Sequence, residues 1–286
     1  MNTRFWLIQA FNGLSYGALL FLVGSGLSII FGVMRIVNLA HGSYFLLGGY
    51  VALTVIWTTG SWALALVVAA LSVALIGLLM EWIFLRPLGF DPLRQVLLTV
   101  GFAFLFQQAA LDIWTGNNFD INPPEALTRS VVIGGLYLPL YRVFMIATAL
   151  VIGLVLWLVM EKTRMGAAVR ATVDDAQMAR GVGIDTSRIS MLIFALGAFL
   201  AALGGVIGGA FLGIYPGLDF EMLPIAFAVV IIGGMGSLGG AAIGALLVGL
   251  ADNFGKALFP EISYFTLYAP MALILAVKPT GLFGRE

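Results

Sequence analysis

The chain contains no cysteine, only one histidine and few charged side chains. Its 286 residues include 14 Lys or Arg and 14 Asp or Glu, so the formal net charge is zero. Without cysteine there are no disulfides and no thiolate metal sites. A lone histidine, His41, cannot form a histidine metal cluster or a proton relay. Zero net charge gives no case for nucleic-acid binding. We therefore expect no cofactor, no metal and no nucleic-acid partner.

The chain also lacks a nucleotide-binding P-loop. The nearest approach is Gly255-Lys256-Ala257, which has no hydroxyl residue after the lysine, and Leu250 stands where the first glycine is required. The run Gly234 to Gly239 does match GxGxxG, but it lies in an uncharged stretch with no βαβ unit around it. We interpret that run as a helix break or a site of close packing. The sequence shows no means of hydrolysing ATP.

The chain is rich in apolar residues. Hydrophobic residues make up 61% and charged residues 10% of the chain, and the mean hydropathy is +1.07. Soluble domains carry about 25% charged residues, so lipid must cover part of this surface. The uncharged stretch from Phe5 to Met34 is too long for a signal-peptide core and is expected to be a retained first span. The sequence predicts an all-α polytopic membrane protein, with one transmembrane domain over residues 1–286.

Eight stretches are long and apolar enough to be membrane-embedded, since a span needs about 20 apolar residues. They are residues 8–31, 39–58, 63–85, 95–114, 142–160, 190–213, 223–258 and 262–278. The long stretch 223–258 contains the glycine run Gly233 to Gly240, which can break a helix. We therefore expect eight segments, or nine if this stretch is split. A second break is expected between Gly32 and Gly42, and paired discontinuous helices are typical of transporter binding sites.

Residues 161–189 form an island of charge between two apolar runs. The island holds five of the 14 basic and four of the 14 acidic residues, so it must face water. Its basic content favours the cytoplasm, as do the two arginines of the 86–94 loop. The 115–141 loop has no basic excess and is expected outside. Lys278 and Arg285 favour a cytoplasmic tail, which an additional membrane segment in 223–258 would allow.

A short helix is predicted over residues 174–182 within this island. Thr172 or Asp174 can cap its start, and Gly181 or Gly183 can end it. Met178 and Ala179 are expected to form its small apolar face. A folded platform between two spans suits docking of a cytoplasmic partner, whereas a solvated loop is the plain alternative.

Several polar or glycine positions inside the predicted spans are candidates for a translocation path or gate. Each has a plain structural alternative, such as a capped helix end, an interhelical hydrogen bond or close packing. Glu81 and Arg86, at the inner end of the third span, are interpreted as interfacial anchors. The candidate path residues are Asn38, His41, Gln107, Gly234, Gly236 and Gly239.

Motifs over nearly the whole chain resemble the LivH-type permeases of branched-chain amino acid ABC importers. The similar segments are Gly166 to Ala171, Asp174 to Ala179, Gly183 to Asp185, Gly26 to Arg35, Asn38 to Gly42, Arg86 to Leu88, Gly233 to Gly240 and Pro279 to Gly284. One departure is Lys278, where the family pattern has arginine, and the charge is kept.

The resemblance implies a multi-pass permease of the bacterial inner membrane that works with other subunits. These are a second, LivM-like permease, two ATP-binding subunits and an extracytoplasmic solute-binding protein. It also implies that the charged island couples the permease to the ATPases. The residues implied in that coupling are Arg170, Asp174, Asp175, Met178, Ala179, Gly183 and Ile184.

Two other classes of function compete with a non-enzymatic permease subunit for a small polar solute, such as an amino acid. An ion-coupled secondary transporter needs an intramembrane ion site, and no predicted span contains two carboxylates. An intramembrane enzyme needs a catalytic constellation, which one histidine and no cysteine make difficult to build. The residues do not select among branched-chain amino acids, other amino acids, amides, urea and small organic acids.

Overall fold

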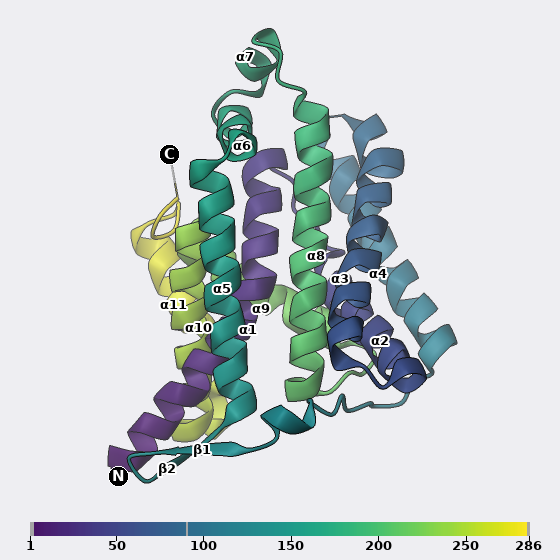
Figure 1. Cartoon of the computed structure of the whole chain (residues 1–286). Coiled ribbons are helices and arrows are strands. Elements are labelled where there is room, and N and C mark those ends of the chain that lie inside the picture. The colour runs from purple at the N-terminus through teal and green to yellow at the C-terminus, as the bar shows by residue number, and fades with distance from the viewer. Residues whose placement is uncertain (1–2, 90, 285–286) are drawn as a thin grey trace.

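The computed structural model describes residues 3–89 and 91–284, and their side chains except those of Ile133 and Tyr264. Within these residues the chain forms α-helices and one antiparallel β-hairpin (Figure 1). In chain order the elements are α1 (Thr3–Met34), α2 (His41–Thr59), α3 (Trp62–Met80), α4 (Pro92–Trp114), β1 (Ser130–Ile133), β2 (Leu136–Pro139), α5 (Leu140–Lys162), α6 (Arg164–Asp174), α7 (Ala176–Gly181), α8 (Thr186–Leu212), α9 (Leu218–Gly233), α10 (Leu238–Leu258) and α11 (Ser263–Val277).

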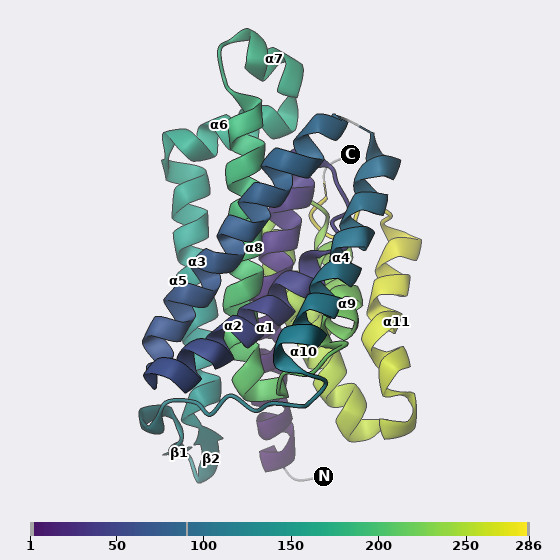
Figure 2. The same ribbon diagram turned by 90° about the vertical axis from the view of Figure 1, so that its right-hand side faces the viewer.

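The long helices lie side by side, and α1 and α8 occupy the middle of the bundle (Figures 1 and 2). In its most apolar stretch, 78% of α1 is buried by other parts of the chain, and for α8 the share is 72%. For α4 and α5 the share is only 17%. Helices that are apolar all round and buried on every side form a bundle core. The exposed apolar faces of α4 and α5 suit contact with lipid or with another membrane subunit.

Small residues allow α1 and α10 to approach each other closely. A Cβ atom added at Gly17 would lie 2.8 Å from the carbonyl oxygen of Ala245, and one added at Gly249 would lie 2.5 Å from that of Gly13. Such contacts leave no room for a larger side chain. Glycine at these positions therefore serves backbone contact between helices, as it commonly does in membrane proteins.

The all-α prediction holds for the bundle, and six helices among the described residues are long and apolar enough to cross a membrane. The predicted stretch 223–258 is two helices, α9 and α10, separated at Gly234 to Ser237. The third predicted span continues beyond α3 through a π-helical turn, Glu81–Leu85, and a 3-10 turn, Arg86–Leu88. The β-hairpin in the 115–141 loop, which turns at Gly134 and Gly135, was not expected from the sequence.

The loops that were predicted to share one side of the membrane lie at the same end of the bundle. Helices α6 and α7 lie at one end, together with the turn from α3 to α4. The chain leaves α11 toward this same end (Figures 1 and 2). The N-terminal end of α1 and the β-hairpin lie at the other. We call these the α7 end and the hairpin end. Arg285, invoked for the orientation of the tail, lies outside the described residues.

Candidate functional site

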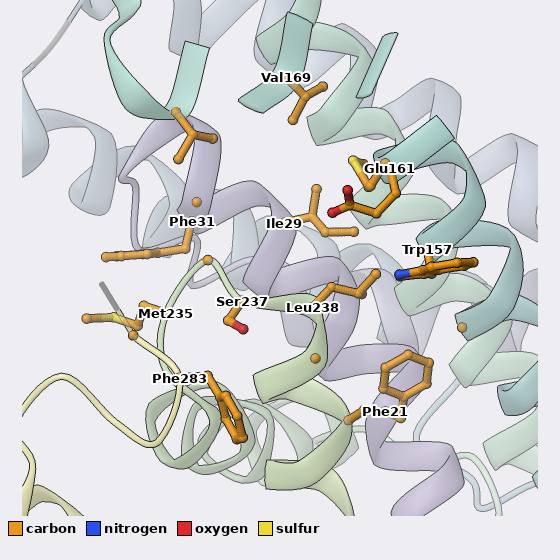
Figure 3. A pocket seen from close by; sticks show the side chains of 18 of the residues that line it. Phe21, Ile29, Phe31, Trp157, Glu161, Val169, Met235, Ser237, Leu238 and Phe283 are labelled. Carbon is orange, nitrogen blue, oxygen red and sulfur yellow. The ribbon is translucent and has the colours of Figure 1, made fainter. Parts of the chain in front are cut away.

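An open groove lies on the face formed by α1, α5 and α10. Its volume is about 1210 Å³. Helix α6, the connection between α9 and α10, and the tail after α11 complete its walls (Figure 3). We call it the α1–α5–α10 groove. Its labelled lining residues, drawn as sticks in Figure 3, are Phe21, Ile29, Phe31, Trp157, Glu161, Val169, Met235, Ser237, Leu238 and Phe283.

The groove is apolar along most of its length and charged near the α7 end. Aromatic and aliphatic side chains form its walls. The charged lining residues are Glu161 at the end of α5, Arg170 and Asp174 on α6, and Arg35 directly after α1. The Arg170 Nη1 lies 3.8 Å from the Glu161 Oε2 and also donates to the carbonyl of Met160. Small-molecule sites commonly occupy about 300–1,000 Å³ and combine apolar walls with a few polar groups. The groove has that character, but it is partly open and not an enclosed cavity.

The break between α9 and α10 forms part of the groove wall. Gly236 has a φ of +82°, a conformation that side chains with a Cβ disfavour, and an added Cβ would lie 2.9 Å from the Cα of Gly32. Ser237 then caps α10, because its Oγ accepts a hydrogen bond from the Gly240 amide at 3.0 Å. The glycine run thus ends one helix and starts the next against α1. At Gly239, by contrast, an added Cβ would have no atom of the described residues within 4 Å, so the expectation of close packing there is wrong.

The tail after α11 completes this break. The amides of Leu282 and Phe283 donate to the carbonyls of Ile232 and Gly233, each at 2.9 Å. Those carbonyls belong to the last turn of α9, which has no further helical partner for them. Gly234, with a φ of +99°, lies directly beneath Gly284. The segment Pro279 to Gly284 therefore caps α9 and holds the break in place.

The predicted path residues do not form one site. Gly236 and Gly239 line the α1–α5–α10 groove, and Gly234 lies next to it beneath the tail. Gln107 lies on α4, which packs against α2 and is no part of the groove. Asn38 and His41 are completely buried on another side of α1. The sequence could not separate these groups because the separation depends on which helices are neighbours.

Asn38 and His41 belong to a buried junction between two discontinuous helices. The chain loses helical structure after Met34 and resumes it at His41, as the predicted break between Gly32 and Gly42 requires. His41 Nε2 donates to the carbonyl of Val23 at 3.0 Å. Since Val23 is well inside α1, helix α2 begins within the bundle.

Helix α9 begins at the same junction. The Ser43 Oγ donates to the Asp219 Oδ2 at 3.0 Å, and Asp219 is only 2% exposed. An acid in the first turn of a helix is favoured by the partial positive charge of its N-terminus. Three buried atoms at this junction have no hydrogen-bond partner among the described residues: Asn38 Nδ2, His41 Nδ1 and Asp219 Oδ1. We call Asn38, His41, Ser43 and Asp219 together the half-helix junction. Asp219 precedes the predicted span 223–258 and was not among the residues singled out from the sequence.

The short helix predicted over 174–182 is present as α7, and a second helix that was not predicted, α6, precedes it in the charged island. Thr163 caps α6, since its Oγ1 accepts from the Gly166 amide at 3.1 Å. Asp175 ends α6 and caps α7, because its Oδ1 accepts from the Gln177 and Met178 amides at 2.8 and 2.9 Å. The cap is therefore Asp175 and not Thr172 or Asp174. We call α6 and α7 together the α6–α7 segment.

Met178 and Ala179 lie on opposite sides of α7. Met178 is 66% exposed, whereas Ala179 is 3% exposed and its carbonyl accepts the Ile184 amide at 3.0 Å. The expectation that both residues form one exposed apolar face is wrong. The exposed apolar pair is Met178 with Val182, which is 71% exposed. Gly183, with a φ of +90°, provides the turn that leads to Ile184 and α8.

Comparison with known proteins agrees with this architecture. Residues 9–275 match the family described as the permease component of branched-chain amino acid transport systems. The chain is 30% identical to the high-affinity branched-chain amino acid transport system permease proteins LivH of Salmonella typhimurium and Escherichia coli K12, over 98% of this chain and 96% of each of those proteins. It is 29% identical to BraD of Pseudomonas aeruginosa, with the same coverage.

No solved structure matches the chain. The family match covers far more than half of its length, and the matched region includes most of α1 and all of the other five long apolar helices among the described residues. The chain is therefore a multi-pass protein of the bacterial inner membrane, and it belongs to the family of permease components of branched-chain amino acid transport systems.

Proposed function

We propose that this chain is the permease subunit of an ABC importer that moves amino acids across the membrane with energy from separate ATPase subunits. The observation that carries the proposal is the family match over residues 9–275, which includes both the membrane helices and the α6–α7 segment. The absence of a P-loop from the sequence fits this division of labour. A transport permease is not a class of enzyme, and we assign no catalytic residues.

We propose a single transmembrane domain with nine membrane-embedded segments, one more than the eight apolar stretches of the sequence. They are the six long apolar helices and the three shorter ones, α2, α9 and α11. Nine segments put the two termini on opposite sides of the membrane. With the α7 end in the cytoplasm, the tail is cytoplasmic and the β-hairpin is external, in agreement with the distribution of basic residues.

We assign the α1–α5–α10 groove as this subunit's half of the solute path. The groove is partly open, so a second, LivM-like permease subunit has to close it before a solute can be shielded from lipid. The apolar wall suits aliphatic side chains, and the charged residues where α5 meets α6 suit the two charges of an amino acid. Gly236 and Gly239 keep their proposed place on this path. A solute-binding protein would deliver the solute at the hairpin end.

We assign the α6–α7 segment as this permease's contact with an ATP-binding subunit. The importer would have two ATP-binding subunits, one for each permease. Met178 and Val182 are the exposed apolar side chains that an ATPase cleft can cover. Arg170 ties α6 to the end of α5, so motion of the segment reaches α5 directly. Asp175 maintains the helix break, and Gly183 and Ile184 form the return to α8. Ala179 supports α7 from beneath, and Asp174 lies at the end of α6 beside the groove.

The half-helix junction contains one feature that favours the competing function, an ion-coupled secondary transporter. The sequence did not reveal this feature. Asp219 is a buried acid inside the bundle, and intramembrane acids commonly mark ion pathways. The two functions differ in their energy source and in their partners. Only the ABC importer needs stable association with ATP-binding subunits.

Affinity capture of the tagged chain from membranes of its native host tests the proposal. We expect mass spectrometry to identify a second permease of the same family and ATP-binding proteins that carry P-loops. The Met178→Glu variant is the matched control, because it should keep the second permease and lose most of the ATPase. A parent chain that is recovered without any P-loop protein would contradict the assignment.

A further inference from the structure

A second, small hollow lies between the α6–α7 segment and the helix bundle. Its volume is about 140 Å³, enough for a few water molecules at roughly 30 Å³ each. Five parts of the chain that are distant in sequence line it: the end of α1, the π-helical turn after α3, the start of α4, the α6–α7 segment and the start of α8. We call it the α7 cavity.

Glu81 is the one carboxylate among the described residues that line the α7 cavity. The residue is only 2% exposed, and its Oε2 has no hydrogen-bond partner in the described part of the chain. It is therefore no interfacial anchor, as the sequence suggested. It begins the π-helical turn Glu81–Leu85, and π-turns inside helices occur frequently at functional sites. A buried carboxylate oxygen without a hydrogen-bond partner is costly, so the position calls for an explanation.

The groups across the cavity from Glu81 supply an explanation for this buried acid. Arg180 and Ala176 come from α7, and Arg86 follows the π-turn itself. A displacement of α7 changes the distance between the Arg180 guanidinium and the Glu81 carboxylate, which lies at the start of the π-helical turn after α3. Because opposite charges attract, that distance contributes to the relative energy of two positions of α7, although Arg180 is exposed and water weakens the attraction.

The other wall of the cavity leads to the half-helix junction. Met34 and Ile36 line the cavity, and the chain continues from them to the buried Asn38 and His41. Packed interiors transmit small shifts because they contain few voids. The coupling segment, the π-helical turn after α3 and the connection between α1 and α2 thus all line the α7 cavity.

We propose that Glu81 is a positioning residue of the transport cycle, which links the displacement of α7 to α3 and to the connection between α1 and α2. This inference rests on the proposed function, since it takes an ATPase to move α7. Glu81 itself touches neither solute nor nucleotide in this scheme. Its loss should therefore separate ATP hydrolysis from transport and leave assembly intact.

The test uses the complete importer in proteoliposomes and compares Glu81→Gln with the matched control Glu125→Gln. Glu125 is an exposed glutamate in the loop before β1. We expect Glu81→Gln to assemble and hydrolyse ATP like the parent, while the amount of solute imported per ATP falls by about tenfold, within the usual range for coupling between sites. Glu81→Asp, which keeps the charge, should recover part of that loss. An assembled Glu81→Gln importer with the parental ratio of solute to ATP would overturn the proposal.

A second measurement decides the matter even if Glu81→Gln fails to assemble. Ser190 lines the α7 cavity, and the chain has no native cysteine. In an otherwise parental importer, the thiol of Ser190→Cys should react at different rates without nucleotide and with ATP and vanadate. Equal rates in the two states would show that the cavity does not change during the cycle and would refute the proposal. A parental importer with no ATP-dependent uptake would instead refute the proposed function.

Discussion

Two glycines three residues apart, Gly236 and Gly239, should respond in opposite ways to substitution by alanine. Gly236 lies in the break between α9 and α10, Gly239 lies in the first turn of α10, and both line the α1–α5–α10 groove. Only Gly236 has a positive φ, +82°, and only its added Cβ would contact another backbone, 2.9 Å from the Cα of Gly32. Gly239 is already within α10, with open space around the position that its Cβ would take.

The size of the difference follows from these two environments. A left-handed backbone costs an alanine about 1–2 kcal/mol, and overpacking against α1 costs about 1–3 kcal/mol more. Gly236→Ala should therefore destabilise the permease by about 2–5 kcal/mol. Gly239→Ala should stabilise it by up to about 1 kcal/mol, since alanine is the better helix former. Both variants add the same methyl group, so a difference between them reports the effects of backbone conformation and packing at Gly236.

Thermal unfolding of the purified permease in detergent, followed by tryptophan fluorescence, measures this difference. We expect a clearly lower midpoint for Gly236→Ala than for the parent, and an equal or higher midpoint for Gly239→Ala. Equal midpoints for the two variants would refute the account of the break. They would mean that the connection between the two helices tolerates a side chain at either position.

Three further predictions concern the contacts, the junction and the orientation. Met178→Glu should weaken ATPase capture by about thirtyfold, or about 2 kcal/mol, and parental capture would show that this side chain is no contact. Ser43→Ala leaves the Asp219 carboxylate without its donor and should cost about 1–3 kcal/mol of unfolding free energy; an unchanged midpoint would show that the bond does not hold α2 to α9. An impermeant thiol reagent should label Asn118→Cys and not Arg180→Cys in cells with a permeable outer envelope, and the reverse pattern would invert the orientation.

The positions of the spans could be predicted because membrane thickness and helix rise fix the length of an apolar run. The glycine run was predicted as a break because backbone freedom at Gly234 and Gly236 is a local property. The start of α9 could not be predicted in the same way. Asp219 and Glu221 end the apolar run in the sequence, and only the neighbouring Ser43 shows that Asp219 is inside the bundle.

The predicted site was less accurate because burial depends on tertiary neighbours. Ala179 and Met178 are adjacent in sequence and both apolar, yet only one of them faces outward. Glu81 looked like an anchor at a membrane surface because the sequence does not show that the α6–α7 segment and α8 cover it. The groove itself could not be found from the sequence, because its walls come from α1, α5, α6, α10 and the tail.

The most direct test of the central claim is uptake of a radiolabelled amino acid by proteoliposomes that contain this chain, its partner permease and the ATPases, with the loaded binding protein added outside. We predict that uptake needs hydrolysable ATP inside the vesicles and continues when ionophores collapse every ion gradient. Uptake by this chain alone, driven by a proton or sodium gradient without ATP, would contradict the account and would make Asp219 the first residue to examine as an ion site.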